Sequence, residues 1–208
     1  THASPVLATL HGVRQVIFFT QTGLVAAEAA SGRELWRFPF PYSVSTASSP
    51  IVSGDIVYCS AGYGVGAGAC RIAKTGDKFS ATELWRESGK LMNHWTTPIC
   101  RDGYLYGIYG FKEFGTAPLK CVEIATGKEF WSKPGFGSGG GTILVGDQIL
   151  VQGDRGPLVL VDAKPDAYHE VARAELYGGK CWTMPVVSNG RIFARNDKEG
   201  VCLDVAVK

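Results

Sequence analysis

The chain has 208 residues with 21 basic and 19 acidic side chains, so its formal net charge is only +2 at pH 7. This balance gives no electrostatic reason to favour nucleic acid or an anionic membrane as a partner. No stretch approaches the roughly 20 apolar residues of a membrane-spanning helix, and the first residues lack the layout of a signal peptide. We therefore expect a soluble chain with no membrane span and no nucleic-acid partner.

Five similar segments follow one another along the chain. They read HASPVLA from His2, ASSPIVSGDIVY from Ala47, WTTPICRDGYLYG from Trp95, GGGTILVGDQILV from Gly139 and WTMPVVSNGRIFA from Trp182. Each combines an apolar run, a turn, and a second run that alternates with the strand period of two. The spacing predicts repeats at residues 2–46, 47–94, 95–138, 139–181 and 182–208 of a single domain, 1–208.

A third and a fourth strand complete each full repeat. The third strands are expected in LVAAEAA, ACRIAK, LKCVEIA, LVLVDAK and VCLDVAV, and the fourth carries Trp36, Trp85 or Trp131. The alanines of AAEAASGRELW favour a helix, but CVEIATGKEFW has the same frame, and strand preference depends on packing context. Four-stranded antiparallel units at this period predict an all-β fold, a β-propeller, since the repeats of a β-solenoid are much shorter.

The frame shared by AAEAASGRELW and CVEIATGKEFW resembles the tryptophan-docking motif of the pyrroloquinoline-quinone-like (quinoprotein) propeller repeats. The resemblance covers nearly the whole chain, although the second copy carries a five-residue insertion, the fourth repeat lacks the Gly and the Trp, and the last stops after CLDVAV. It implies about four and a half blades of a seven- or eight-bladed ring, completed by the remainder of the same propeller. A closed ring of five blades and a ring built by two chains remain open alternatives.

The repeated residues have a structural explanation. Gly32, Gly76 and Gly127 suit a tight turn with positive φ, and the tryptophans that follow can lie across the next blade. The acidic residues Glu28 and Glu123, and by alignment Asp162 and Asp204, are placed to accept hydrogen bonds from turn N–H groups. Residues repeated in every blade indicate packing, so no catalytic residue is predicted among them.

The six cysteines lack CxxC spacing and a His-rich partner stretch, so no metal site is predicted. Cys70, Cys121 and Cys202 occupy one repeat position, where the first repeat has Ala26, and we expect small buried residues there. Cys59 and Cys100 are interpreted in the same way. The number of cysteines does not indicate the redox compartment.

In a propeller, the loops that precede the first strands and the connections between second and third strands share one face, where function concentrates. On this face we expect a ligand site with His94, Trp95, Lys180 and Trp182, and with polar contacts from Arg155, Arg195 and Asp197; Asp154 and Asn196 are further polar candidates. Two alternatives stand beside this hypothesis. The two tryptophans can instead fill space between first strands. His94 can be an ordinary loop histidine, because no nucleophile motif accompanies it.

Three functions are compatible with these residues. The first is a non-catalytic scaffold or binding module for a protein or cell-surface ligand, similar to the propeller lipoprotein of the outer-membrane β-barrel assembly machinery; that resemblance implies a periplasmic or other extracytoplasmic location. The second is a quinone-dependent dehydrogenase with pyrroloquinoline quinone and calcium, but the chain lacks that family's Cys-Cys pair and carboxylate cluster. The third is a carbohydrate-binding propeller, which Trp95 and Trp182 permit. We expect the first, with no cofactor and no enzymatic activity.

Overall fold

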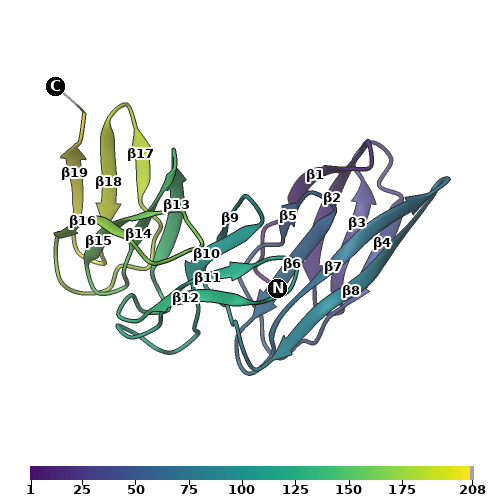
Figure 1. The fold of residues 1–208 in the computed structure, drawn as a ribbon, viewed down its shortest axis with the longest axis horizontal. Helices are drawn as coiled ribbons and strands as arrows, with labels where there is room; N and C mark the ends of the chain where they lie inside the picture. The colour runs from purple at the N-terminus through teal and green to yellow at the C-terminus, as the bar shows by residue number, and fades with distance from the viewer. Residues whose placement is uncertain (207–208) are drawn as a thin grey trace.

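The computed structural model describes residues 1–206, and this range folds into strands and turns without any helix. Five antiparallel sheets follow one another along the chain (Figure 1). The first contains β1 (Val6–Leu10), β2 (Val13–Thr20), β3 (Gly23–Glu28) and β4 (Glu34–Pro39). The second contains β5 (Ile51–Ser53), β6 (Ile56–Ala61), β7 (Gly66–Thr75) and β8 (Lys78–Ser88).

The remaining sheets repeat this plan. The third contains β9 (Ile99–Arg101), β10 (Tyr104–Ile108), β11 (Leu119–Glu123) and β12 (Glu129–Lys133). The fourth contains β13 (Gly141–Val145), β14 (Gln148–Gln152), β15 (Pro157–Asp162) and β16 (Glu170–Glu175). The fifth has three strands, β17 (Val186–Ser188), β18 (Arg191–Arg195) and β19 (Gly200–Asp204).

Within every sheet the strands are hydrogen-bonded in their sequence order, which is the meander of a propeller blade. The predicted fold class is therefore confirmed, with four four-stranded sheets and one of three strands. Over residues 1–206 the sheets form an open arc and do not close into a ring (Figure 1).

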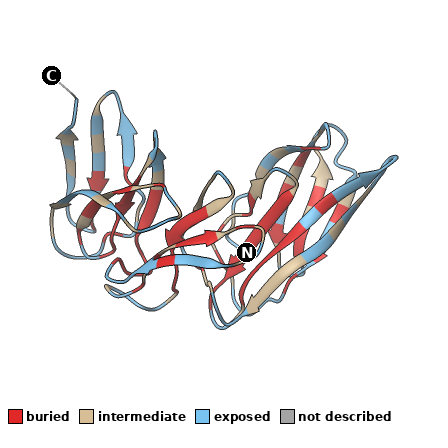
Figure 2. Ribbon diagram, in the orientation of Figure 1, coloured by how far each residue is buried: buried red, intermediate tan, exposed pale blue. Residues whose placement is uncertain are grey.

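The core consists of three hydrophobic clusters, each between successive sheets. They join the first sheet to the second, the second to the third, and the third to the fourth. Strand β6 is buried along its whole length because Val57 and Cys59 face the first sheet while Tyr58 faces the third. The fifth sheet joins none of these clusters, and Figure 2 shows its strands largely exposed or half-buried. The packing of the arc is therefore tight up to the fourth sheet and loose beyond it.

The pairing of third and fourth strands shifts by one residue at the same place in each four-stranded sheet. Just before this bulge, the third strand faces the docking tryptophan in three sheets and an alanine in the fourth; the pairs are Ala26–Trp36, Ala69–Trp85, Cys121–Trp131 and Leu160–Ala172. The fourth strands accordingly read ELWR, ELWR, EFWS and EVAR. Ala172 is thus the fourth sheet's counterpart of the tryptophans.

Two of the tryptophans contact the next sheet through their indole N–H groups. Trp85 donates to the Ile124 carbonyl at 2.8 Å, and Trp131 donates to the Lys164 carbonyl at 2.9 Å. Trp36 donates instead to Gln15 of its own sheet at 2.7 Å. The turn that follows the third strand is displaced in the second sheet, because the β7–β8 hairpin extends well beyond the other hairpins.

The three predicted turn glycines have positive φ, at 74° for Gly32, 59° for Gly76 and 74° for Gly127. Of the acidic residues, Asp204 accepts the backbone N–H group of Ala206 at 3.2 Å as predicted, whereas Asp162 accepts the side-chain amide of Gln148 at 3.2 Å. For Glu28 and Glu123 the predicted donor was wrong. The carboxylates of Glu28 and Glu123 accept the hydroxyl groups of Ser31 and Thr126, each at 2.5 Å. These hydroxyls in turn accept the turn N–H groups, at 3.2 Å in both cases. In both turns the Ser or Thr hydroxyl group thus bridges the carboxylate and the backbone N–H group.

The cysteine alignment also needs correction. Ala69, and not Cys70, stands opposite the tryptophan of its sheet, because the long hairpin moves the alignment by one residue. Cys202 has the predicted position but is exposed, since within residues 1–206 β19 is an edge strand with no fourth strand beside it. Cys59, Cys70, Cys121 and Cys181 are buried and Cys100 is half-buried, and all six thiols are free.

Candidate functional site

Four exposed aromatic side chains converge on one face from loops of three sheets. Tyr63 lies between β6 and β7, Trp95 precedes β9, Phe114 lies between β10 and β11, and Trp182 precedes β17. Their exposed fractions are 38%, 43%, 37% and 48%. We refer to these four residues as the aromatic shelf.

The rings of the shelf lie nearly parallel where they meet. Trp95 and Trp182 have centroids 6.3 Å apart with an 18° interplanar angle, and Phe114 stacks on Trp182 at 5.2 Å and 15°. Trp182 lies over Gly139, where a Cβ atom would stand only 2.4 Å from the indole. The indole N–H of Trp95 donates to the Phe111 carbonyl at 3.1 Å. Glycine at 139 is therefore needed for the two indoles to approach one another.

His94 lies beneath the shelf and is only 3% exposed. Its ring packs edge-on against Trp95 at 4.4 Å and against Tyr63 at 5.0 Å. Its Nδ1 atom has no hydrogen-bond partner and faces Gly62, whose absent Cβ would be 2.8 Å away. Burial lowers the pKa of His94, so the imidazole is neutral at physiological pH. In this position His94 supports the two exposed rings from below.

Two lysines lie over faces of the aromatic cluster. Lys112 Nζ is 4.8 Å from the centroid of Tyr63, and Lys180 Nζ is 5.0 Å from that of Trp182. Such ammonium groups are attracted by the negative face of an aromatic ring. Burial raises the pKa of nearby Glu113, but hydrogen bonds from the N–H groups of Lys112 and Phe111 outweigh this and leave the pKa below its usual value. The surroundings of the shelf therefore carry charges of both signs.

Asp154 fastens the loops that carry Phe114 and Trp182. Its carboxylate accepts the N–H groups of Gly115 at 2.9 Å and Gly139 at 3.4 Å, and its own carbonyl accepts the Cys181 N–H at 3.0 Å. The side chain is 1% exposed, and this burial raises its pKa. Asp154 thus organises the shelf from within and does not present its carboxylate to a ligand.

The structure brings together four of the predicted site residues and places the others nearby or apart. His94, Trp95, Lys180 and Trp182 are in contact with one another or with the shelf. Exposed Arg155 lies against Gly115, next to Phe114. Arg195 is the last residue of β18 and Asp197 lies in the connection that follows, and among residues 1–206 neither forms a hydrogen bond or ring contact with the shelf. Asn196 is buried and accepts the N–H groups of Lys198 and Glu199.

Sequence reasoning did not single out Tyr63, Phe111, Lys112 or Phe114. The signal for them was present, because the connections SAGYGVGAGA and IYGFKEFGTAP both carry aromatic residues on the face where a ligand site was predicted. Their convergence depends on how far each loop reaches across the arc, which the repeat pattern does not specify.

Comparison with known proteins places this fold in a family. The family described as "Outer membrane protein assembly factor BamB", built on PQQ-like repeats, matches residues 2–107, just over half of the chain. The chain belongs to this family. The matched residues run from the first sheet to β10 of the third, and the match agrees with the resemblance found in the sequence motifs.

Two solved structures are similar to this BamB-like chain. One is the computationally designed protein Ika8, with 14% identity and a TM-score of 0.66 over 96% of this chain and 57% of Ika8. The other is BamB from Moraxella catarrhalis, with 17% identity and a TM-score of 0.43 over 90% of this chain and 66% of that protein. The present chain therefore spans less than two thirds of either protein. No curated protein matches it.

Residues 1–206 contain no cluster of three or more His, Cys, Asp or Glu side chains arranged for a metal ion. The same range has no helix with the length and hydrophobicity to cross a membrane.

Proposed function

We propose that this BamB-like chain is a non-catalytic binding module that presents the aromatic shelf to a protein partner. The observation that carries the proposal is the convergence of four aromatic rings, each more than a third exposed, from loops of three sheets. Tryptophan and tyrosine are enriched among the residues that contribute most to protein–protein binding. A contiguous exposed aromatic surface is also characteristic of interaction sites.

The shelf is held in place before any partner arrives. Trp95 is fixed by its hydrogen bond to Phe111 and by His94 beneath it, and Trp182 is stacked between Trp95 and Phe114. A side chain that is already ordered loses little conformational entropy on binding, so more of the burial energy contributes to affinity. The tightly packed second and third sheets, whose loops carry Tyr63, Trp95 and Phe114, support the same interpretation.

Family membership supports two further parts of the proposal. The family description refers to outer membrane protein assembly, which favours an extracytoplasmic, periplasmic location and a protein partner for this chain. We further propose that the chain works without pyrroloquinoline quinone or calcium, because the sequence lacks the Cys-Cys pair and carboxylate cluster of the quinone-dependent dehydrogenases. A carbohydrate ligand at the two indoles is the alternative that the binding experiment must separate from a protein partner.

The test replaces Trp95 and Trp182 together by Ala and measures binding and stability in parallel. Photo-crosslinking from a probe residue at position 114, in extracts of the source cells, identifies the partner protein, and the affinity of the purified pair is then measured. We expect the double variant to lose at least tenfold in affinity, because central aromatic anchors often contribute about 2 kcal/mol or more each. Its melting temperature should change little.

Phe130→Ala is the matched control, since Phe130 is 37% exposed but lies on β12, away from the shelf. This variant should bind the partner as the wild type does. Full binding by the double variant, or a large fall in its melting temperature with affinity retained, contradicts the proposal and indicates that the indoles are packing residues. Selective loss of a glycan from an array, with no crosslinked protein, would replace the protein partner by a carbohydrate.

A further inference from the structure

A second potential binding site lies between the fourth and fifth sheets, away from the aromatic shelf. It is a groove of about 510 Å³ whose lining is almost entirely aliphatic. Leu150, Leu158, Leu160 and Ala172 form the wall on the fourth sheet, and Ile192 and Leu203 face them from the fifth. An apolar cavity of roughly 150 Å³ already suffices to hold a benzene ring. The groove therefore has room for a larger apolar ligand.

The groove exists because one tryptophan is missing from the repeat. Ala172 stands where Trp36, Trp85 and Trp131 stand in the other sheets, at the register position just before the bulge. Those three indoles fill the space between neighbouring sheets, whereas Ala172 is exposed. The empty volume thus corresponds to the position of an indole ring.

The wall of the groove on the fifth sheet resembles the surface against which a docking tryptophan packs elsewhere in the chain. Ile192 pairs with Leu203 in the fifth sheet as Ile149 pairs with Val161 in the fourth, and the latter two belong to the cluster that contains Trp131. Val205 takes the place of Ile124, because each donates its N–H to the carbonyl at the preceding hairpin turn. Ile124 is the residue whose carbonyl accepts the Trp85 indole N–H. Val205, which lines the groove, offers a carbonyl at the equivalent position.

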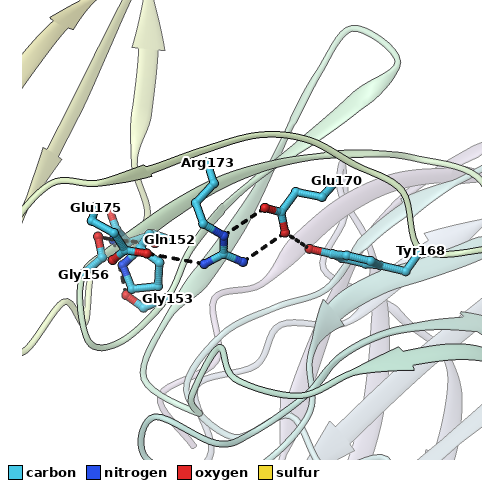
Figure 3. Close-up of polar contacts among 8 residues, drawn as sticks. Gln152, Gly153, Gly156, Tyr168, Glu170, Arg173 and Glu175 are labelled. Carbon is cyan, nitrogen blue, oxygen red and sulfur yellow. Dashed lines mark hydrogen bonds and ion pairs between the residues drawn. The ribbon is translucent and has the colours of Figure 1, made fainter.

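The charges at the rim disfavour an anionic ligand. Arg173 lines the groove, but its guanidinium is held by Glu170 at 2.9 and 3.0 Å and by Glu175 at 3.5 Å (Figure 3). Two carboxylates face this one guanidinium, so the rim offers no free cation to an acidic head group. A neutral ligand carries no charge that the two carboxylates would repel.

We propose that the groove between the fourth and fifth sheets binds a small, neutral, two-ring aromatic molecule of the indole class. Its ring lies beside Ala172, between Leu160 and the pair Ile192 and Leu203, and its N–H donates to the Val205 carbonyl. This site is independent of the proposed protein-binding function, since none of its lining residues belongs to the aromatic shelf.

The test titrates indole into the full chain and follows the methyl NMR signals of Ile192 and Leu203. Saturable shifts of these methyl groups are expected in the wild type. Ala172→Trp places an indole in the groove and should weaken the binding of free indole at least tenfold. Val171→Trp is the matched control: Val171 is the 44% exposed neighbour outside the groove, so this variant should bind indole as the wild type does.

Two further comparisons define the chemistry. Indole-3-acetate should bind at least tenfold more weakly than indole because of the acidic rim, and 1-methylindole should bind more weakly because it has no N–H. Leu203→Gln, on the opposite wall, provides a second test if Ala172→Trp does not fold. The absence of saturable methyl shifts in the wild type, or equal indole affinity in a natively folded Ala172→Trp variant, would overturn the proposal.

Discussion

The indole ring of Trp85 lies directly against Gly127 of the next sheet. A Cβ atom on Gly127 would stand 2.8 Å from the ring, and the residue has a φ of 74°. Because any side chain there meets both strain and overlap, Gly127→Ala should destabilise the fold by about 2–4 kcal/mol. Urea denaturation measures this change.

Gly32→Ala is the control for this substitution, because Gly32 has the same φ of 74° but no atom within 4 Å of its would-be Cβ. It should cost only about 1–2 kcal/mol, the strain of a left-handed conformation alone. Equal losses in the two variants would show that the contact with Trp85 contributes nothing.

Trp131 should be one of the most costly single residues to remove. It is 9% exposed, packs against Tyr106 and Tyr168, and donates its indole N–H to the Lys164 carbonyl. Trp131→Ala should destabilise the fold by roughly 3–5 kcal/mol, the range for truncating a large buried aromatic. Thermal and urea unfolding measure the loss. An unchanged melting curve would show that the docking of Trp131 does not stabilise the fold.

Much of the fold was predictable because the repeat writes its strands and turns into the sequence. Gly32, Gly76 and Gly127 have positive φ because each Ser-Gly or Thr-Gly pair forms a tight turn. The alignment at Cys70 was wrong by one residue, since the place of a bulge in a lengthened hairpin depends on strand pairing. The groove between the fourth and fifth sheets could not be predicted either. The sequence EVAR shows that the tryptophan is absent, but it does not show whether the fifth sheet packs into the volume that the indole would occupy.

The candidate site was only partly predictable for a different reason. The exposure of Trp95 and Trp182 depends on Gly139 allowing one indole to lie over it, a contact between residues far apart in the sequence. The burial of His94 depends in the same way on Gly62, which lies between β6 and β7 and more than 30 positions earlier in the sequence. The position of these residues within the repeat predicts the face on which they lie, but it does not predict how far each side chain is buried.

The purified protein should carry no redox-active quinone. The sequence has no adjacent Cys-Cys pair and no clustered Glu, Asn and Asp of the kind that hold pyrroloquinoline quinone and calcium in the dehydrogenases. An absorbance spectrum, and a dye-reduction assay with added quinone, calcium and an alcohol, measure this. Robust dye reduction would contradict the proposal of a non-catalytic module.

Glu170 should contribute stability that depends on pH. Hydrogen bonds from Arg173, and then from the Tyr168 hydroxyl at 2.6 Å, lower the pKa of its carboxyl from 4.5 to about 2 (Figure 3). A carboxyl whose pKa is lower in the folded state stabilises the fold fully above its unfolded value of 4.5. That stabilisation is lost as the pH falls through about 2.

Glu170→Gln should therefore lower the free energy of unfolding at pH 7 by about 1–2 kcal/mol, less than the full shift implies because the pair is partly screened by solvent. The difference from the wild type should shrink as the pH falls below 4.5 and vanish near 2.

Glu175→Gln is the control, because Glu175 lies 3.5 Å from Arg173 and its side chain is 67% exposed. Exposed pairs of this kind contribute little, so Glu175→Gln should leave the unfolding curve nearly unchanged at every pH. Urea unfolding from pH 2 to 7 measures both variants, and a deficit in Glu170→Gln that does not vary with pH would show that the ionised carboxylate has no part in holding Tyr168 and Arg173.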